Sequence, residues 1–298
     1  MTKPLPFSPQ MQVRPDVKAF FDQDTETFSY VVRDPGSQAC AVVDCVLNID
    51  YASGTVTHEG ADAMIAWIRD QQLTLEWLIE THVHADHLTA APYIQEALGG
   101  KIGIGTNITE VQEVFAGIYN AEPAFKRDGS QFDVLFRDGD SYQIGGLTAY
   151  AMHTPGHTPA CMTHVIGNCA FVGDTLFMPD VGTARADFPG GDARTLHQSI
   201  MQVLSLPDDM RLLMCHDYPE NRDVAYETSV AQEKQHNIHV HDGVSEDEFV
   251  AMREKRDAKL DMPRLILPSL QVNMRAGHMP PKEDNGRVYL KLPINAFK

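Results

Sequence analysis

One short stretch, residues 81–87 (Thr-His-Val-His-Ala-Asp-His), restricts what this chain can fold into more than any other feature. Four side chains that can bind a metal lie within six consecutive positions: His82, His84, Asp86 and His87. Histidine nitrogens and carboxylate oxygens are the ligands of zinc and of iron in proteins. So dense a group of these side chains is best explained by a cation that holds them, and the stretch therefore predicts a metal site.

The flanks of this stretch predict the backbone that carries it. Residues 76–80 are typical of a short buried strand, and residues 88–98 of a helix that ends at Gly99-Gly100. The metal-binding side chains would then lie on a turn between a strand and a helix. His82 and His84 are two positions apart and point the same way in an extended backbone, so one cleft can receive both.

Strands alternate with helices in two halves of the chain, roughly 1–125 and 130–235, which predicts two sheets packed together with helices outside. Ser245 and Glu248 predict a capping box at the start of a helix that reaches about residue 259. Three further expectations concern single segments: a polar loop over 47–58, a helix over 223–236, and irregular structure in the proline-rich segment after about residue 263.

Composition excludes some classes of function. The chain has 24 basic and 41 acidic residues and a net charge of −17, which argues against binding to nucleic acid. No run approaches the roughly 18 apolar residues that span a membrane. The N-terminus has no apolar run after Lys3, so no signal peptide is predicted and a cytoplasmic location is expected. The five cysteines are expected to be reduced thiols in the core.

The second half of the chain supplies more candidate ligands. His157, Asp174 and His216 each follow a predicted strand. Ligands at the ends of strands can meet at one edge of a sheet and form a rigid metal site. Taken singly, each of these residues would more often belong to an ordinary turn or to the surface. Together with residues 82–87, and in this order, they match one known architecture, and that resemblance implies one shared site.

The order of these residues resembles the metallo-β-lactamase superfamily, over roughly residues 15–220. The resemblance implies an α/β fold, the αββα sandwich, in which two mixed β-sheets pack face to face with helices outside. We expect a catalytic domain over residues 1–235 and a C-terminal extension, residues 236–298, packed on the same domain. In the superfamily's dinuclear members, the residues matching His82, His84 and His157 hold one metal. Those matching Asp86, His87 and His216 hold the other, and the residue matching Asp174 bridges the two.

Three stretches resemble the persulfide dioxygenases (sulfur dioxygenases, the group of the ethylmalonic encephalopathy protein): residues 182–188, 216–218 and 272–277. The loop at 47–58 and the long C-terminal tail are more similar to the bacterial β-lactamase-like hydrolase branch of that group. The resemblance implies one Fe(II) per chain, held by His82, His157 and Asp174. Glutathione persulfide and O₂ would react there to give sulfite and glutathione. The remaining superfamily ligands would act as catalytic neighbours of the iron: His84, Asp86, His87 and His216.

Three residues are candidates for binding the substrate. Arg185 and Arg275 can pair with the carboxylates of glutathione, and Tyr218 can supply a hydroxyl group. The resemblance also suggests a homodimer.

Two alternatives remain open. The first is a glyoxalase II-like thioester hydrolase (hydroxyacylglutathione hydrolase-like) that uses two zinc ions on the same ligands. The second is a non-catalytic metal- or sulfide-binding regulator with the same fold. Antibiotic hydrolysis is disfavoured, because true class B β-lactamases lack the aspartate that Asp174 matches.

Overall fold

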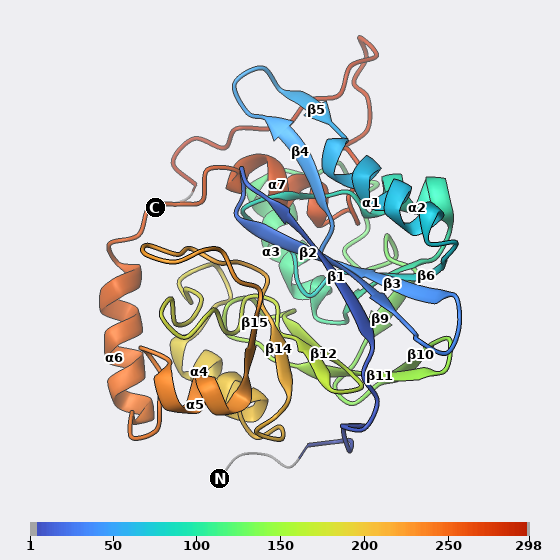
Figure 1. Ribbon diagram of the computed structural model, residues 1–298. Helices are drawn as coiled ribbons and strands as arrows, with labels where there is room; N and C mark the ends of the chain where they lie inside the picture. The colour runs from blue at the N-terminus through green and yellow to red at the C-terminus, as the bar shows by residue number, and fades with distance from the viewer. Residues whose placement is uncertain (1–4, 297–298) are drawn as a thin grey trace.

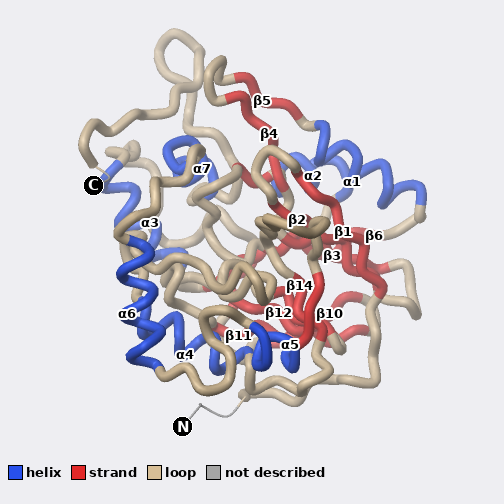
Figure 2. The backbone as a smooth tube through the Cα atoms, turned by 60° about the vertical axis from the view of Figure 1, so that its left-hand side comes forward, coloured by secondary structure: helices blue, strands red, loops and turns tan. Residues whose placement is uncertain are grey.

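The computed structural model describes residues 5–296. Residues 1–4, which belong to the N-terminal segment for which no signal peptide is predicted, lie outside the described residues, as do residues 297–298. Two mixed sheets lie at the centre and helices cover them from both sides (Figures 1 and 2). This confirms the predicted αββα sandwich.

The first sheet comes mainly from the first half of the chain, and its strand order is β1-β2-β3-β6-β8-β9. The first three strands are antiparallel and the others are parallel to β3. The strands are β1 (Asp16–Asp22), β2 (Thr27–Arg33), β3 (Ala39–Val43), β6 (Thr74–Ile79), β8 (Lys101–Gly105) and β9 (Val134–Phe136). The helices on its outer side are α1 (Glu59–Asp70), α2 (Ala91–Leu98), α3 (Ile108–Ile118) and α7 (Ile266–Asn273).

The second sheet has the order β10-β11-β12-β13-β14-β15, in which only β13 and β14 are parallel neighbours. Its strands are β10 (Ser141–Ile144), β11 (Leu147–His153), β12 (Met162–Ile166), β13 (Cys169–Phe171), β14 (Arg211–Leu213) and β15 (Glu227–Ser229). The helices on its side are α4 (Ala193–Val203), α5 (Val230–His236) and α6 (Glu246–Asp257).

The alternation of side chains along the strands divides the core. In β2, Phe28, Tyr30 and Val32 pack between the two sheets, whereas Val31 packs under the helices of the first sheet. Successive strand residues point to opposite faces, so an apolar strand can supply both layers. A third cluster, which includes Phe249 of α6, fills the space between the second sheet and its helices.

The segment after the histidine cluster differs from the prediction of a helix over 88–98. Residues 88–89 form strand β7 (Leu88–Thr89), which pairs with strand β4 (Val46–Asp50), and helix α2 begins only at Ala91. Pro92 has no backbone N–H and fits only the first turn of a helix, which explains the late start.

Three other segments also differ from expectation. Part of the predicted loop over 47–58 is a hairpin formed by β4 and strand β5 (Thr55–Thr57). Residues 227–229 pair with β14 as β15, so the helix predicted over 223–236 covers only α5. The segment predicted to be irregular after residue 263 contains α7, whose buried side chains pack on the first sheet's helical layer.

Two other predictions, the capping box and the buried thiols, are confirmed. Ser245 and Glu248 form a reciprocal capping box at the start of α6. Each of the five cysteines is free and buried. Among the residues that the structure describes, no helix is long and apolar enough to cross a membrane.

Candidate metal centre

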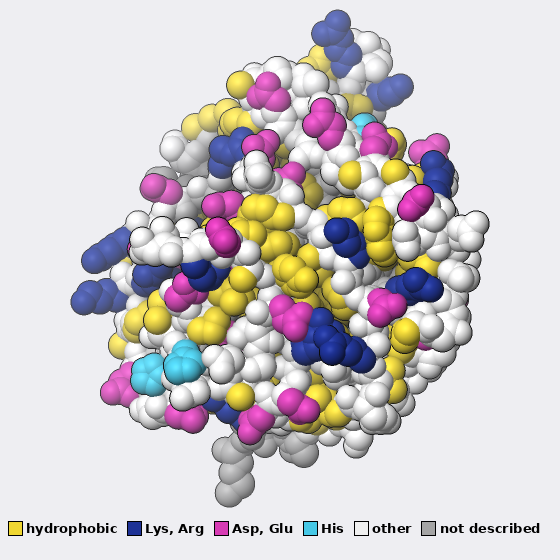
Figure 3. Space-filling model, viewed as in Figure 1, with side chains coloured by type: hydrophobic (Ala, Val, Ile, Leu, Met, Phe, Trp, Pro, Cys, Tyr) yellow, Lys and Arg dark blue, Asp and Glu magenta, His cyan; other side chains and the backbone are white. Residues whose placement is uncertain are grey.

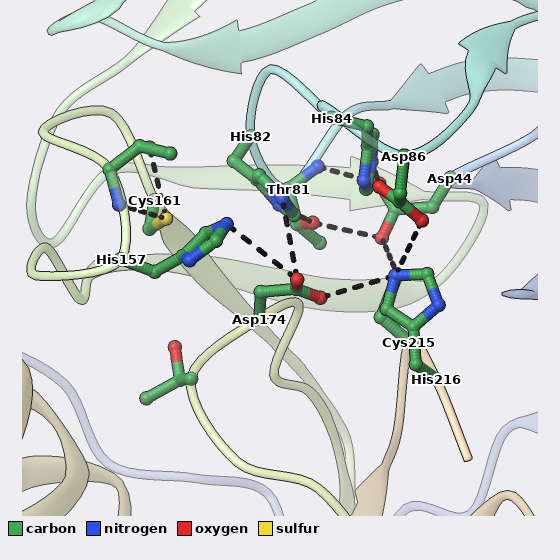
Figure 4. A network of polar contacts seen from close by, with 12 residues as sticks. Asp44, Thr81, His82, His84, Asp86, His157, Cys161, Asp174, Cys215 and His216 are labelled. Atoms are coloured by element: carbon green, nitrogen blue, oxygen red, sulfur yellow. Dashed lines mark hydrogen bonds and ion pairs between the residues drawn. The ribbon is translucent and has the colours of Figure 1, made fainter. Parts of the chain in front are cut away.

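The seven predicted ligands meet at one edge of the sandwich, and Figure 4 labels all of them except His87. The loop that follows β6 carries the first four, and the segments after β11, β13 and β14 carry His157, Asp174 and His216. Two compact groups result, in each of which the potential ligand atoms lie within 4.8 Å of one another. The first group is His82, His157 and Asp174, and the second is His84, Asp86, His87 and His216.

Asp174 lies between the two groups. Its Oδ2 is 4.0 Å from His82 Nε2 and 3.6 Å from His157 Nε2. Its Oδ1 is 3.4 Å from His216 Nε2, on the other side. One carboxylate therefore reaches both groups, as a bridging ligand must.

Several atoms of this centre are buried without a hydrogen-bond partner among residues 5–296. These atoms are His82 Nε2, His84 Nδ1, His87 Nε2, His216 Nε2 and Asp174 Oδ1. A buried polar atom without a hydrogen-bond partner costs about 1–3 kcal/mol. The charged contacts that three of these atoms make are with other potential ligands of the same centre, so an ion bound among them explains all five best. The residues present fit a metal centre.

In three of the imidazole rings, an oxygen atom holds the nitrogen that points away from the centre. His84 Nε2 lies 3.0 Å from Asp44 Oδ1, His157 Nδ1 lies 2.8 Å from the carbonyl oxygen of Arg185, and His216 Nδ1 lies 3.1 Å from that of Glu26. If each of these nitrogens carries the proton and donates it to its oxygen, the opposite nitrogen of each ring presents a lone pair to the centre.

Asp44 is a contributor that the sequence interpretation missed. It follows β3 in a left-handed backbone conformation with φ of 51°, and it accepts hydrogen bonds from the Thr81 backbone N–H (2.8 Å) and from the Thr81 hydroxyl (2.9 Å). The Thr81 hydroxyl lies 3.1 Å from His82 Nδ1. Asp44 therefore positions both His82 and His84. The signal that could have revealed it is an aspartate at the end of an otherwise apolar strand.

The electrostatics differ among the ligands: they favour the metal-binding form of His82, His84 and Asp86, whereas they favour the protonated form of His216. Burial lowers the pKa of His82 and of His84 well below the ordinary value, so both rings are neutral. Burial opposes ionisation of Asp86, but His216 and His87 hold the pKa of Asp86 well below its usual range. Burial also disfavours the charged form of His216, yet the carboxylates of Asp86 and Asp174 raise its pKa.

Helix α7 ties down the ligand loop through Asn273. The Asn273 side-chain N–H groups donate to the carbonyl oxygens of His84 (2.8 Å) and His87 (2.7 Å). Its Oδ1 accepts from the backbone N–H of Thr89 at 2.9 Å. Three hydrogen bonds from one buried side chain thus fix the backbone around the second group of ligands.

Helix α6 supports the opposite side of the centre through a buried ion pair. Arg253 Nε lies 2.8 Å from Asp257 Oδ1, and a second guanidinium nitrogen donates to the carbonyl oxygen of Thr183. Asp257 Oδ2 accepts from the backbone N–H of Ala186. The pair therefore holds residues 183–186, the segment whose Arg185 carbonyl orients His157.

A cavity of about 400 Å³ opens beside Asp86, His157 and Asp174. Arg185 and Tyr218, two of the predicted substrate-binding residues, line it. The Arg185 guanidinium is already paired with Asp187, at 2.6 and 2.8 Å. The Tyr218 ring stacks on His216 with an interplanar angle of 9°.

The structure does not bring Arg275, the third predicted substrate-binding residue, to this cavity. Arg275 follows α7 and forms two hydrogen bonds with the carboxylate of Glu122, at 2.7 and 2.8 Å. Its guanidinium also lies 4.3 Å from the centre of the Phe125 ring. These contacts give it a structural role under the first sheet's helices.

An αββα sandwich with such a ligand set defines a class of metal-dependent proteins, and comparison with known proteins agrees. A family model described as the metallo-beta-lactamase superfamily matches residues 23–216. The chain therefore belongs to the metallo-β-lactamase superfamily.

The relatives carry different functional names. A probable metallo-hydrolase of Burkholderia pseudomallei is 56% identical over 292 residues, which cover 94% of this chain and 99% of the relative. Glyoxylase B2 of Dictyostelium discoideum is 45% identical and covers 97% and 100% of the two chains. The human mitochondrial persulfide dioxygenase ETHE1 is 28% identical and covers 89% and 90%.

A solved structure shows the same architecture. The crystal structure of ETHE1 from Myxococcus xanthus superposes with a TM-score of 0.71 at 29% sequence identity. The match covers 88% of this chain and 100% of that one. Most of this chain therefore shares the fold of that protein.

Proposed function

We propose that this protein is an iron-dependent persulfide dioxygenase that oxidises glutathione persulfide with O₂. The observation that carries the proposal is the first ligand group. His82, His157 and Asp174 converge from three separate segments, and two of them, His157 and Asp174, line the cavity. Two histidines and one carboxylate that leave coordination positions open suit non-haem Fe(II) oxygen chemistry.

Iron bound by these residues would supply the redox chemistry toward O₂ that side chains lack. Overall, O₂ oxidises the terminal sulfur of the persulfide, water supplies the third oxygen of sulfite and cleaves the S–S bond, and glutathione leaves as the thiol. Asp86, which lines the cavity and whose Oδ2 lies 3.1 Å from His216 Nε2, is placed to orient that water. Asp44 and the carbonyl of Arg185 keep the histidine rings in their binding orientation.

The cavity walls suit a substrate of this size. A volume of about 400 Å³ falls in the range of small-molecule sites. Phe177 and Phe188 give the cavity apolar walls, while Tyr218 offers a hydroxyl group. The homodimer and the cytoplasmic location stay predictions from the sequence.

A second candidate function is a zinc-dependent glutathione-thioester hydrolase. The second ligand group favours it, because Asp86, His87 and His216 complete a pair of sites around Asp174. The name of the Dictyostelium relative, Glyoxylase B2, points the same way. Two metals on either side of one carboxylate are suited to activating water for hydrolysis.

Oxygen uptake separates the two functions. With the protein loaded with iron, glutathione persulfide should cause O₂ consumption with sulfite formed in equal amount, and S-lactoylglutathione should not be turned over. The variant His82→Ala should be inactive, whereas His241→Ala, which changes an exposed histidine far along the chain, should behave as the wild type. Absence of O₂ uptake, together with turnover of S-lactoylglutathione by a form with two metals, would favour the hydrolase instead.

A further inference from the structure

The wall of the cavity contains two arginines that lack a partner. Arg256, in the last turn of α6, and Arg264, shortly after it, both line the cavity beside Asp86 and His157. Both are exposed, and neither forms an ion pair or a side-chain hydrogen bond with any residue of the described range 5–296. Hydrogen bonds from Ser53 and Ala52, and to a smaller extent the charge of Arg264, lower the pKa of the exposed Asp50.

The other arginines of the same cavity are engaged in the fold. Arg185 is bound to Asp187, and Arg253 is buried with Asp257. An unpaired guanidinium can form two parallel hydrogen bonds with a carboxylate, a geometry that an ammonium group cannot match. Arg256 and Arg264 are therefore the cations of this cavity that remain available to a ligand.

The position of these arginines is unusual for so acidic a chain. The net charge is −17, yet basic side chains gather over the C-terminal end of α6, at the left edge of Figure 3. Local positive charge at the mouth of a site attracts anionic ligands in spite of the net charge. Leu260 and Pro263, from the same segment, also line the cavity and give the ligand apolar contact.

We propose that Arg256 and Arg264 bind the carboxylate groups of the peptide part of the thiol substrate, while its sulfur lies at His157 and Asp174. This rests on the proposed function, because it takes a low-molecular-weight peptide thiol as the substrate. Asp24, Glu26 and Asp261 line the same cavity. These carboxylates would repel a polyanion such as a phosphorylated carrier, whereas they tolerate a zwitterion that also carries an ammonium group. The cavity thus selects a zwitterionic peptide thiol.

Calorimetric titration with S-methylglutathione tests this assignment. The thioether is a weak metal ligand, so its binding reports the peptide part and needs no turnover. The double variant Arg256→Ala/Arg264→Ala should bind it at least about tenfold more weakly than the wild type, as expected when charge-assisted hydrogen bonds are lost. The diethyl ester of S-methylglutathione, which lacks both carboxylates, should bind the wild type and the double variant equally.

A matched control removes the same charge from the same helix end. Lys255 and Lys259 are exposed and line a neighbouring cavity instead of the one at the metal centre. Lys255→Ala/Lys259→Ala should therefore leave the affinity for S-methylglutathione within about twofold of the wild type. Unchanged thermal unfolding of both double variants would show that the fold is intact.

Three results would overturn the assignment: no binding of S-methylglutathione to the wild type, an equal loss of affinity in the two double variants, or an equal loss for the diethyl ester. The outcome is separate from that of the proposed function. A protein that binds S-methylglutathione through these arginines but consumes no O₂ with glutathione persulfide would contradict the dioxygenase and support the assignment. If Arg256→Ala/Arg264→Ala still consumed O₂ with glutathione persulfide and bound S-methylglutathione as tightly as the wild type, the result would support the dioxygenase and contradict the assignment.

Discussion

The ligand loop, residues 81–87, and the C-terminal segment, residues 236–298, build the same centre in opposite ways. The loop is almost wholly buried and carries four of the seven predicted ligands. The C-terminal segment supplies none of the seven predicted ligands, yet its Asn273 and Arg253 hold the backbone on both sides of them. It also provides part of the cavity wall through Arg256 and Arg264.

The difference shows two separate tasks: the loop carries predicted ligands, and the C-terminal segment fixes the positions of the ligands. A metal site needs the correct ligands, and it also needs surrounding groups that fix them. In this protein the ligands come from the matched family region, 23–216, and much of their support comes from beyond it. Changes in the loop should therefore abolish activity outright, whereas changes in the C-terminal segment should weaken stability, metal affinity or substrate affinity by graded amounts.

The largest effect is expected within the loop itself. His82→Ala should remove iron and reduce oxygen uptake to background, because His82 belongs to the group with His157 and Asp174. His87→Ala should keep most of its iron, because His87 belongs to the other group. Elemental analysis of both variants as purified measures this. Equal loss of metal in the two variants would contradict the assignment of a single iron to the first group.

The next largest effect is expected at the buried pair of α6. Arg253→Ala leaves the carboxylate of Asp257 buried without its partner, which should cost about 3–5 kcal/mol in the free energy of unfolding. Urea denaturation measures this loss. Glu254→Ala, at an exposed position of the same helix, is the control and should change stability by less than about 0.5 kcal/mol. Similar stability of the two variants would show that α6 does not support the centre.

A smaller effect is expected from loss of the hydrogen bonds between α7 and the loop. Asn273→Ala removes the hydrogen bonds to the carbonyls of His84 and His87, and iron affinity should fall about 10–100-fold, as for other groups that orient ligands. Competition with a chelator measures it. Gln271→Ala is the matched control, because this side chain of the same helix bonds Leu267 and Lys291 instead of the loop. An equal fall in iron affinity in both variants would mean that the hydrogen bonds from Asn273 to the loop have no specific role.

The smallest effect concerns pH and His239. Burial, and then the charges of Arg253 and Arg256, lower the pKa of His239 to about 4. Its Nδ1 accepts a hydrogen bond from the Thr183 backbone N–H, which requires that nitrogen to be unprotonated. Because the folded state binds fewer protons than the unfolded state, stability should be complete above pH 6.5 and should fall as pH drops from about 6.5 toward 4.

The variant His239→Gln isolates this contribution. It cannot titrate, so its unfolding free energy should decline less steeply than that of the wild type between pH 7 and pH 4. If the unfolding free energies of the two proteins fell equally over this pH range, protonation of His239 would not contribute to the loss of stability, and its contact with residues 182–186 would not be sensitive to pH.

The ligands were predictable from the sequence because each follows a strand, and strands of a sandwich end at common edges. For His157, Asp174 and His216 this local rule was not enough, and their prediction rested on the resemblance of the whole ordered set to one known family. The main errors in secondary structure fell on short strands, such as Leu88–Thr89, that form only through pairing with distant segments. Periodicity within a segment carries no information on such pairing.

The supporting residues were not predictable, since their roles depend on contacts between remote positions. Asn273 and His84 are 189 positions apart, and Arg253 and Thr183 are 70 apart. Arg253 lies in a helix whose strongly charged sequence is typical of a solvent-exposed helix. Arg275 was a candidate because of its charge and because residues 272–277 resemble the persulfide dioxygenases, but Glu122, 153 positions away, holds its guanidinium.

Reconstitution of the metal-free protein tests the central claim most directly. Fe(II) and Zn(II) are added in separate titrations, and oxygen uptake with glutathione persulfide is recorded at each metal content. The account predicts that uptake rises with iron, reaches its maximum at one iron per chain, and is absent with zinc. Absence of uptake at every iron content, with hydrolysis of S-lactoylglutathione that reaches its maximum at two zinc ions per chain, would contradict it.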